Sequence, residues 1–202
     1  MKNKLFLRAC AVGLFSLSML FGLGQHIAHA EQGQHAQQTH QIDYAQSHVY
    51  FSAAHAGNAF RGEFQEWQGE VHFDPTDLEQ SLITAEFTLS EAKTGNKMFD
   101  GTLPSADWFD VENHPKAHFE TTEILDNADG TYQAEAALTL RDVTLPISFS
   151  FTVSDLAIEP VTVKAAFEID RLAYGIGQGS DGKAEWVSQM IGIDLELIAH
   201  QQ

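Results

Sequence analysis

Apolar and polar residues alternate along most of the chain. In ISFSFTV, the side chains of Ile147, Phe149, Phe151 and Val153 fall on one face, and the serines and the threonine between them fall on the other. Three further segments alternate in the same way: 131–140, 161–170 and 191–197. Because successive side chains of a β-strand point to opposite faces, this period of two predicts four half-buried strands.

Other segments are apolar and short enough to be strands, and they are separated by turn residues such as Asp74-Pro75 and Asp129-Gly130. These strand candidates are 48–55, 60–67, 69–74, 81–90 and 116–125. Segment 93–115 lacks the alternation and is expected to hold a short helix. The pattern predicts an all-β fold, an antiparallel barrel of about eight strands with a short helical insertion.

A membrane barrel would show the same alternation with its apolar face turned outward. The strand candidates mostly run seven to ten residues and carry no aromatic girdles at both ends. We therefore expect a soluble barrel with an apolar interior. At about eight strands, such an interior is either just filled by side chains or holds one small ligand.

The N-terminal segment reads as an export signal. A basic start, an apolar run and the small-residue site AHA ending at Ala30 together predict a secretory signal peptide over 1–30. Residues 31–41 are polar and low in complexity, which predicts a disordered leader before a barrel domain at 42–202. The expected location is periplasmic or secreted, with no transmembrane segment in the mature chain.

Charge narrows the range of partners. Removal of Lys2, Lys4 and Arg8 with the signal leaves eight Lys and Arg against 28 Asp and Glu, a formal charge of −20. This charge argues against nucleic acid, anionic lipid surfaces and polyanionic ligands. It favours a neutral ligand over an anionic one.

The stretch GIGQGSDGKA, 175–184, superficially resembles a phosphate-binding loop. The last position of that pattern should be Ser or Thr, but here it is Ala184. The segment that follows predicts a strand and not an amphipathic helix. We therefore expect the glycines to form a tight connection between neighbouring strands.

Motifs for catalysis or metal binding are missing from the sequence. There is no Gly-x-Ser-x-Gly and no His-x-x-Glu-His spacing. His72 and His118 alternate with inward-facing residues and should point outward, whereas His55 shares the inward phase of Val49 and Phe51. One inward histidine is not a metal site. We expect no catalytic residues, no metal and no cofactor.

Several stretches together resemble the YceI-like family of exported proteins, and their order covers essentially all of 42–202. They are DYAQSHVYFSAAHAG, RGEFQEWQGEVHFDP, TGNKMFDGTLPSADWFDVENHPKAHFE, ALTLRDVTLPI and FEIDRLAYGIGQG. The resemblance implies a lipocalin-like antiparallel barrel. It also implies that an elongated apolar cavity holds a polyisoprenoid lipid, such as a quinone with a long prenyl tail, without catalysis.

If the resemblance is correct, the inward-facing residues are the expected ligand contacts. These are Phe87, Phe119, Phe149, Phe151, Phe167, Ile169, Ile193, Leu195, His55 and Arg171. The aromatic residues fit a fully packed core equally well. Arg171 continues the inward phase of its strand, so it either donates to a ligand oxygen or forms an ion pair with an acid at the rim.

The leading hypothesis is an exported carrier of a long-chain isoprenoid lipid, which would bind through many contacts of about 0.8 kcal/mol per buried methylene. Two alternatives remain: an enzyme acting on an isoprenoid lipid, and a filled barrel that binds another protein through its acidic surface. The sequence leaves open a homodimer and a membrane-protein partner in lipid or quinone metabolism.

Overall fold

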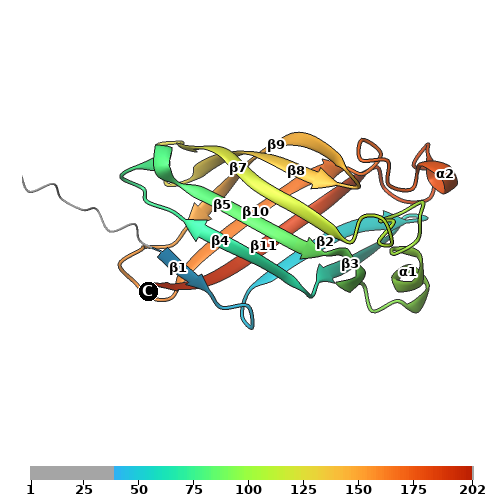
Figure 1. Ribbon diagram of the computed structural model, residues 1–202, viewed down its shortest axis with the longest axis horizontal. Helices are drawn as coiled ribbons and strands as arrows, with labels where there is room; N and C mark the ends of the chain where they lie inside the picture. The colour runs from blue at the N-terminus through green and yellow to red at the C-terminus, as the bar shows by residue number, and fades with distance from the viewer. Residues whose placement is uncertain (1–38, 202) are drawn as a thin grey trace, which may run out of the picture. The chain divides into compact units, whose positions relative to one another are not determined.

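The alternating segments form eleven β-strands in one antiparallel sheet that closes into a barrel (Figure 1). The computed structural model describes residues 39–201. The strands are β1 (Thr39–Ile42), β2 (His48–His55), β3 (Asn58–Phe64), β4 (Trp67–His72), β5 (Leu82–Thr88), β6 (Ala92–Lys93), β7 (Lys116–Asp126), β8 (Tyr132–Leu140), β9 (Val143–Val153), β10 (Val161–Asp170) and β11 (Met190–Gln201). The helical segments are η1 (Leu78–Gln80), η2 (Leu89–Glu91), α1 (Lys97–Thr102) and α2 (Gln178–Asp181).

Three positions around the barrel are each shared by two successive strands. At the first position, β1 and β2 both pair with β11. At the second position, β4 pairs with β1 and β3 pairs with β2. At the third position, β5 pairs with β4 and β6 pairs with β3. The remaining positions belong to β7, β8, β9, β10 and β11. When each of the three pairs is counted as one interrupted strand, the barrel has eight positions, as the sequence predicted.

The predicted inward and outward faces are clearest in β8 and β9. Ala134 and Phe149 are buried partners across the two strands. On the outer face, the Ser150 hydroxyl donates to Gln133 at 2.9 Å, and the Ser148 hydroxyl donates to Glu135 at 2.6 Å. The alternation therefore sorts apolar side chains to the interior and polar side chains to water.

The first strand begins earlier than expected. We assigned residues 31–41 to a polar leader, but Thr39–Ile42 form β1. His40 pairs with both Val71 of β4 and Gln201 of β11, so this segment helps to close the barrel. The rest of the leader and the predicted signal peptide lie outside the described residues.

The predicted helical insertion covers one end of the barrel, which we call the cap end. Between β6 and β7 the chain forms α1, whose first turn is capped by the Asn96 side chain, which accepts from the Met98 N–H at 2.9 Å. Leu103 and Phe109 from this insertion pack into the core cluster beneath it. Figure 1 shows α1 and α2 at this same end, opposite β1.

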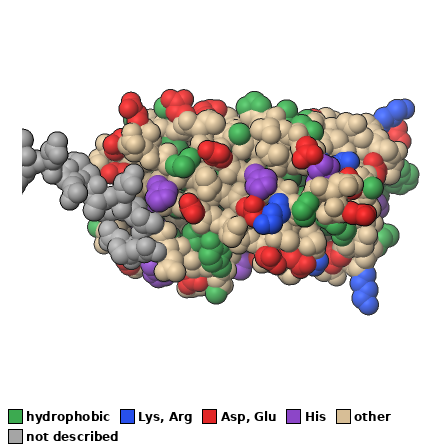
Figure 2. Space-filling model, viewed as in Figure 1, with side chains coloured by type: hydrophobic (Ala, Val, Ile, Leu, Met, Phe, Trp, Pro, Cys, Tyr) green, Lys and Arg blue, Asp and Glu red, His purple; other side chains and the backbone are tan. Residues whose placement is uncertain are grey.

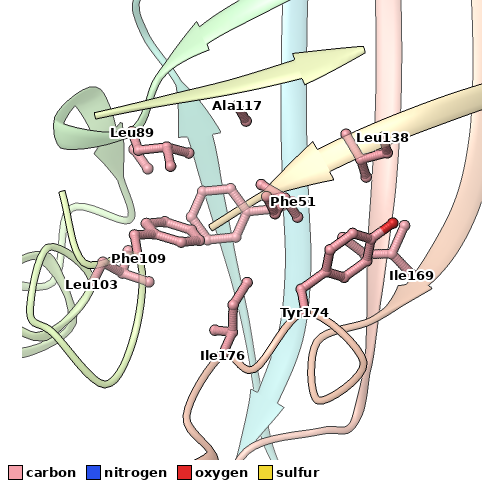
Figure 3. Packing of buried hydrophobic residues seen from close by; sticks show 11 residues of the cluster. Phe51, Leu89, Leu103, Phe109, Ala117, Leu138, Ile169, Tyr174 and Ile176 are labelled. Carbon is pink, nitrogen blue, oxygen red and sulfur yellow. The ribbon is translucent and has the colours of Figure 1, made fainter. Parts of the chain in front are cut away.

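Two clusters of buried residues pack inside the barrel. The cluster at the cap end includes Phe51, Leu89 and Tyr174 (Figure 3). Phe51 lies directly over Gly62 of β3, where an added Cβ would be 2.1 Å from the ring. The second cluster includes Phe73 and lies farther along the barrel. Between and within these clusters the packing leaves space.

Candidate functional site

An apolar cavity of about 130 Å³ occupies the middle of the barrel. Its lining includes eight of the ten predicted ligand contacts, namely Phe87, Phe119, Phe149, Phe151, Phe167, Ile169, Ile193 and Leu195. The two rings of Phe149 and Phe167 stack with centroids 4.2 Å apart. The structure therefore gathers these side chains around a space, although their role as lipid contacts remains a prediction.

The lining offers almost no polar group to a ligand. None of the described residues that line the cavity carries a titratable side chain. The Thr121 hydroxyl, which is part of the lining, already accepts a hydrogen bond from the Ile83 N–H at 2.9 Å. A cavity with such walls does not hold water well and favours an apolar occupant.

Two smaller cavities adjoin the central one. A cavity of about 70 Å³ at the cap end shares Phe64, Leu140, Ile169 and Ile193 with its lining. A cavity of about 30 Å³ toward β1 shares other lining residues with the central cavity, including Val163. Apolar space thus follows the barrel from the cap end toward β1, which suits an elongated ligand better than a compact one.

His55 lies outside the central cavity. It ends β2, and its ring lies 5.4 Å from that of Phe99 on α1, measured between centroids. His118 is exposed and pairs with Glu86 at 3.4 Å, and His72 is half-buried. In the part of the chain that the structure describes, no three His, Cys, Asp or Glu side chains come together as a metal site.

Arg171 forms the ion pair that we considered as the alternative to a ligand contact. Its side chain is 1% exposed and donates to the Asp181 carboxylate at 2.8 Å. The same guanidinium also donates to the backbone carbonyls of Ile176, Val187 and Ser188. Arg171 therefore organises the segment 171–189, which we call the cap loop. It does not line the central cavity, but it lines the smaller cavity at the cap end, so its role as a ligand contact stays a prediction.

Asp181 is the second centre of the cap loop. It accepts from the backbone N–H groups of Glu185, Trp186 and Val187 as well as from Arg171. Burial pushes the pKa of the Asp181 carboxyl upward, but these N–H groups and the Arg171 charge outweigh burial, so its pKa lies below the ordinary value. The charged pair is satisfied on both sides.

The glycine stretch is not the tight connection that we expected. It belongs to the cap loop and holds the short helix α2, preceded by Gly177 at φ 70°. The Asp107 carboxylate accepts from the Gly179 and Ser180 N–H groups at 2.7 and 2.8 Å. The first N–H groups of α2 are therefore occupied from within the protein, which disfavours phosphate at this helix.

Sequence patterns missed the residues that hold the cap loop. Asp107 and Asp181 lie in loops, where no alternation assigns a direction to a side chain. Arg141 donates to the carbonyls of Ala106 and Asp107 from the turn between β8 and β9. Only Arg171 carried a signal, because it continues the phase of β10.

The described residues contain no helix with the length and apolar composition needed to cross a bilayer. Comparison with known sequences gives one family, since the YceI-like domain matches residues 40–199. A "UPF0312 protein" of Pseudomonas savastanoi pv. phaseolicola is 29% identical over 154 residues, covering 76% of this chain and 75% of the relative. A "UPF0312 protein" of Pseudomonas putida KT2440 is 27% identical over 152 residues, covering 75% and 74%.

Two solved structures share the fold. BcnA of Burkholderia cenocepacia superposes with a TM-score of 0.75 at 23% identity, covering 79% of this chain and 100% of BcnA. A polyisoprenoid binding domain from Saccharophagus degradans superposes with a TM-score of 0.65 at 15% identity, covering 82% of this chain and 99% of that domain. At these identities the similarity establishes the shared barrel.

Proposed function

We propose, from the premise that this chain belongs to the YceI-like domain family, that the protein binds a long-chain isoprenoid lipid inside its barrel and carries it without transforming it. The expected ligand is a prenyl quinone or a lipid like it. The ligand class is suggested by the polyisoprenoid binding domain of Saccharophagus degradans, which shares the fold. We also propose that the protein works in an exported compartment, as the sequence of residues 1–30 predicts.

The apolar cavity is the observation that carries the proposal. By the measure in which one water needs about 10 to 15 Å³, the central space of about 130 Å³ holds on the order of ten water-sized groups. Each methylene buried there contributes about 0.8 kcal/mol. An isoprenoid segment therefore binds through shape and burial alone, and the adjoining cavities give room for a longer tail.

The same lining supports binding without reaction. General acid–base or nucleophilic catalysis needs a titratable or nucleophilic side chain within hydrogen-bond reach of the reacting atoms. The described residues around the central cavity supply none that is titratable. We therefore favour a carrier over an enzyme that acts on an isoprenoid lipid.

The surface charge supports a neutral headgroup. Figure 2 shows acidic side chains scattered over the visible face of the barrel, with few Lys and Arg among them. The most buried cation, Arg171, is engaged by Asp181 and by backbone carbonyls. A pyrophosphate would therefore meet a repulsive field, whereas a quinone carries no charge into it.

The test places one added side chain inside the cavity and a matched one outside. Ala165 is buried and lines the cavity, and its neighbour Ala166 is exposed on the outer face. Uptake of a prenyl quinone by lipid-free protein is followed by quenching of tryptophan fluorescence, since Trp67 lines the cavity. We expect Ala165→Leu to weaken binding by more than about tenfold, because the three added carbons displace ligand methylenes.

The control, Ala166→Leu, should bind the quinone like the wild type. Urea unfolding of each variant verifies that the barrel is intact, since overpacking by a few carbons costs about 1 to 3 kcal/mol. The proposal fails if the wild type takes up no quinone, or if a folded Ala165→Leu protein binds it as well as the wild type does.

A further inference from the structure

Tyr174 carries a buried hydroxyl without a partner. The residue is 2% exposed, and within residues 39–201 its hydroxyl and the His72 Nδ1 are the buried side-chain polar atoms that lack a hydrogen bond. His72 lies on β4 and is only half-buried. Native proteins pair the large majority of such atoms, because burying a hydroxyl without a partner is unfavourable. Phenylalanine would fill the same space without this penalty.

The hydroxyl points toward the wall of the central cavity. Figure 3 shows the Tyr174 ring with its oxygen directed toward Leu138 and Ile169. All three residues belong to the core cluster at the cap end, and Leu138 and Ile169 line the central cavity. Tyr174 is not itself part of the lining of the central or the cap-end cavity, so the unpaired donor lies just behind the cavity wall at the cap end.

The backbone around Tyr174 is held firmly. The Tyr174 N–H donates to the Arg171 carbonyl at 3.2 Å, and the Ile176 N–H donates to the same carbonyl at 3.0 Å. Arg171 is in turn fixed by its pair with Asp181. The hydroxyl is thus placed by a hydrogen-bonded part of the cap loop, which is the preorganisation that a ligand contact needs.

A buried water is a poor explanation for the missing partner. Such a water needs two to four polar partners, and the two side chains toward which the hydroxyl points in Figure 3, Leu138 and Ile169, offer none. Burial also raises the pKa of Tyr174, so the phenol stays protonated at neutral pH and remains a donor.

We propose that the Tyr174 hydroxyl donates a hydrogen bond to an oxygen of the bound lipid and thereby sets its direction in the barrel. The oxygen-bearing end lies at the cap end, and the apolar tail runs toward β1. The acceptor is an uncharged oxygen such as a quinone carbonyl. This inference rests on the proposed function and adds to it the end of the ligand that the protein recognises.

The experiment compares two probes and two variants. The probes are a long-chain prenyl quinone and squalene, an isoprenoid hydrocarbon without oxygen, each titrated against a fluorescent apolar competitor. The variants are Tyr174→Phe and Tyr132→Phe. Tyr132 pairs with Asp126 where β7 turns into β8, at the opposite end of the barrel from the cap loop. It does not line the central cavity, so it serves as the matched control.

We expect Tyr174→Phe to weaken quinone binding by about 3- to 10-fold, the range for one hydrogen bond, and to leave squalene binding unchanged. Tyr132→Phe should alter neither. Unchanged quinone affinity in Tyr174→Phe, or an equal loss for both probes, overturns the inference while leaving the proposed function standing. A wild type that binds neither probe overturns both.

Thermal unfolding of the lipid-free proteins gives a second, independent readout. Because the hydroxyl has no partner to lose, Tyr174→Phe should unfold at the same temperature as the wild type or at a higher one. A lower unfolding temperature would show that the hydroxyl is already paired in the folded protein, and this also overturns the inference.

Discussion

In the middle of the barrel, none of the described side chains that line the cavity is titratable, whereas the cap loop buries the ion pair of Arg171 and Asp181 at 1% and 7% exposure. The cavity wall makes few directional contacts with its contents. In the cap loop, backbone N–H and carbonyl groups surround both charges. The central cavity is thus enclosed by apolar side chains, whereas the cap loop buries charges that are paired and hydrogen-bonded.

This difference separates two tasks. A wall of apolar side chains needs only the right width, so it accepts a flexible tail and tolerates small changes in shape. A buried charge pair depends on each partner, because the loss of one leaves the other desolvated and unpaired. The wall is suited to hold a lipid, and the cap loop is suited to fix one end of the barrel.

The largest effect should follow from Arg171→Met. The substitution keeps an apolar stem but leaves the Asp181 carboxylate without its cation, and breaking a buried pair in this way costs about 3 to 5 kcal/mol. Lys164→Met is the control, because the Lys164–Glu196 pair is exposed and should contribute less than about 1 kcal/mol. Urea unfolding measures both. Similar losses in the two variants would remove the distinction between the cap loop and the surface.

The next comparison separates packed core from cavity wall. Leu89 is fully buried and does not line the central cavity, so Leu89→Ala should cost about 2 to 5 kcal/mol and leave lipid affinity unchanged. Phe167 lines the cavity, so Phe167→Leu should cost less than about 1.5 kcal/mol and change lipid affinity. If Phe167→Leu costs stability but not affinity, the aromatic residues are core and not ligand contacts.

A smaller effect is expected for Asp107→Ala. The substitution removes the acceptor for two N–H groups of α2, a loss of about 0.5 to 2 kcal/mol by analogy with helix caps. Glu112→Ala changes an exposed acid in the same insertion and should stay within about 0.5 kcal/mol of the wild type. Equal free energies of unfolding in the two variants would show that the Asp107 contacts with α2 contribute nothing to stability.

The smallest expected effect is a dependence of the free energy of unfolding on pH in the acid range. Burial raises the pKa of Asp107. The hydrogen bonds that it accepts from Ser180 and Gly179, together with the nearby Arg141 charge, lower the pKa by more than burial raises it. The net shift is therefore downward, as it is for Asp181. A carboxyl whose pKa is lowered in the folded state stabilises the fold at pH values above its ordinary pKa of 3.8. It loses that contribution as the pH falls through the pKa of the folded state.

Unfolding by acid should therefore be shallower in Asp107→Asn than in the wild type when stability is followed down in pH. Lipid affinity of the folded protein should not change between about pH 5 and pH 8, because none of the described residues that line the central cavity is titratable. If stability falls equally steeply with pH in both proteins, Asp107 does not hold the cap loop through its charge.

The same two regions differ in how far the sequence predicts them. Alternation in β9 and β10 correctly assigned Phe149, Phe151 and Phe167 to the interior, because a strand allows only two directions. It also placed Arg171 inside. It overlooked β1, since Thr39–Ile42 is a polar tetrapeptide whose pairing depends on β4 and β11, far away in the chain.

The cap loop could not be predicted for a physical reason. Asp181 lies ten residues after Arg171, and Asp107 contacts α2 from 72 residues earlier, so their partners are set by tertiary contacts and not by any period. Tyr174 likewise has no sequence signal, because its unpaired hydroxyl is visible only once its neighbours are placed. His55, in phase with Phe51, ends against Phe99 on α1, which alternation cannot anticipate.

Native mass spectrometry of the mildly purified protein, followed by identification of the released molecule, tests the central claim most directly. The account predicts one isoprenoid lipid with an uncharged oxygen bound to each wild-type chain, and a large loss of this species in the Ala165→Leu protein. A wild-type chain that carries no lipid and also takes up no added prenyl quinone would contradict it.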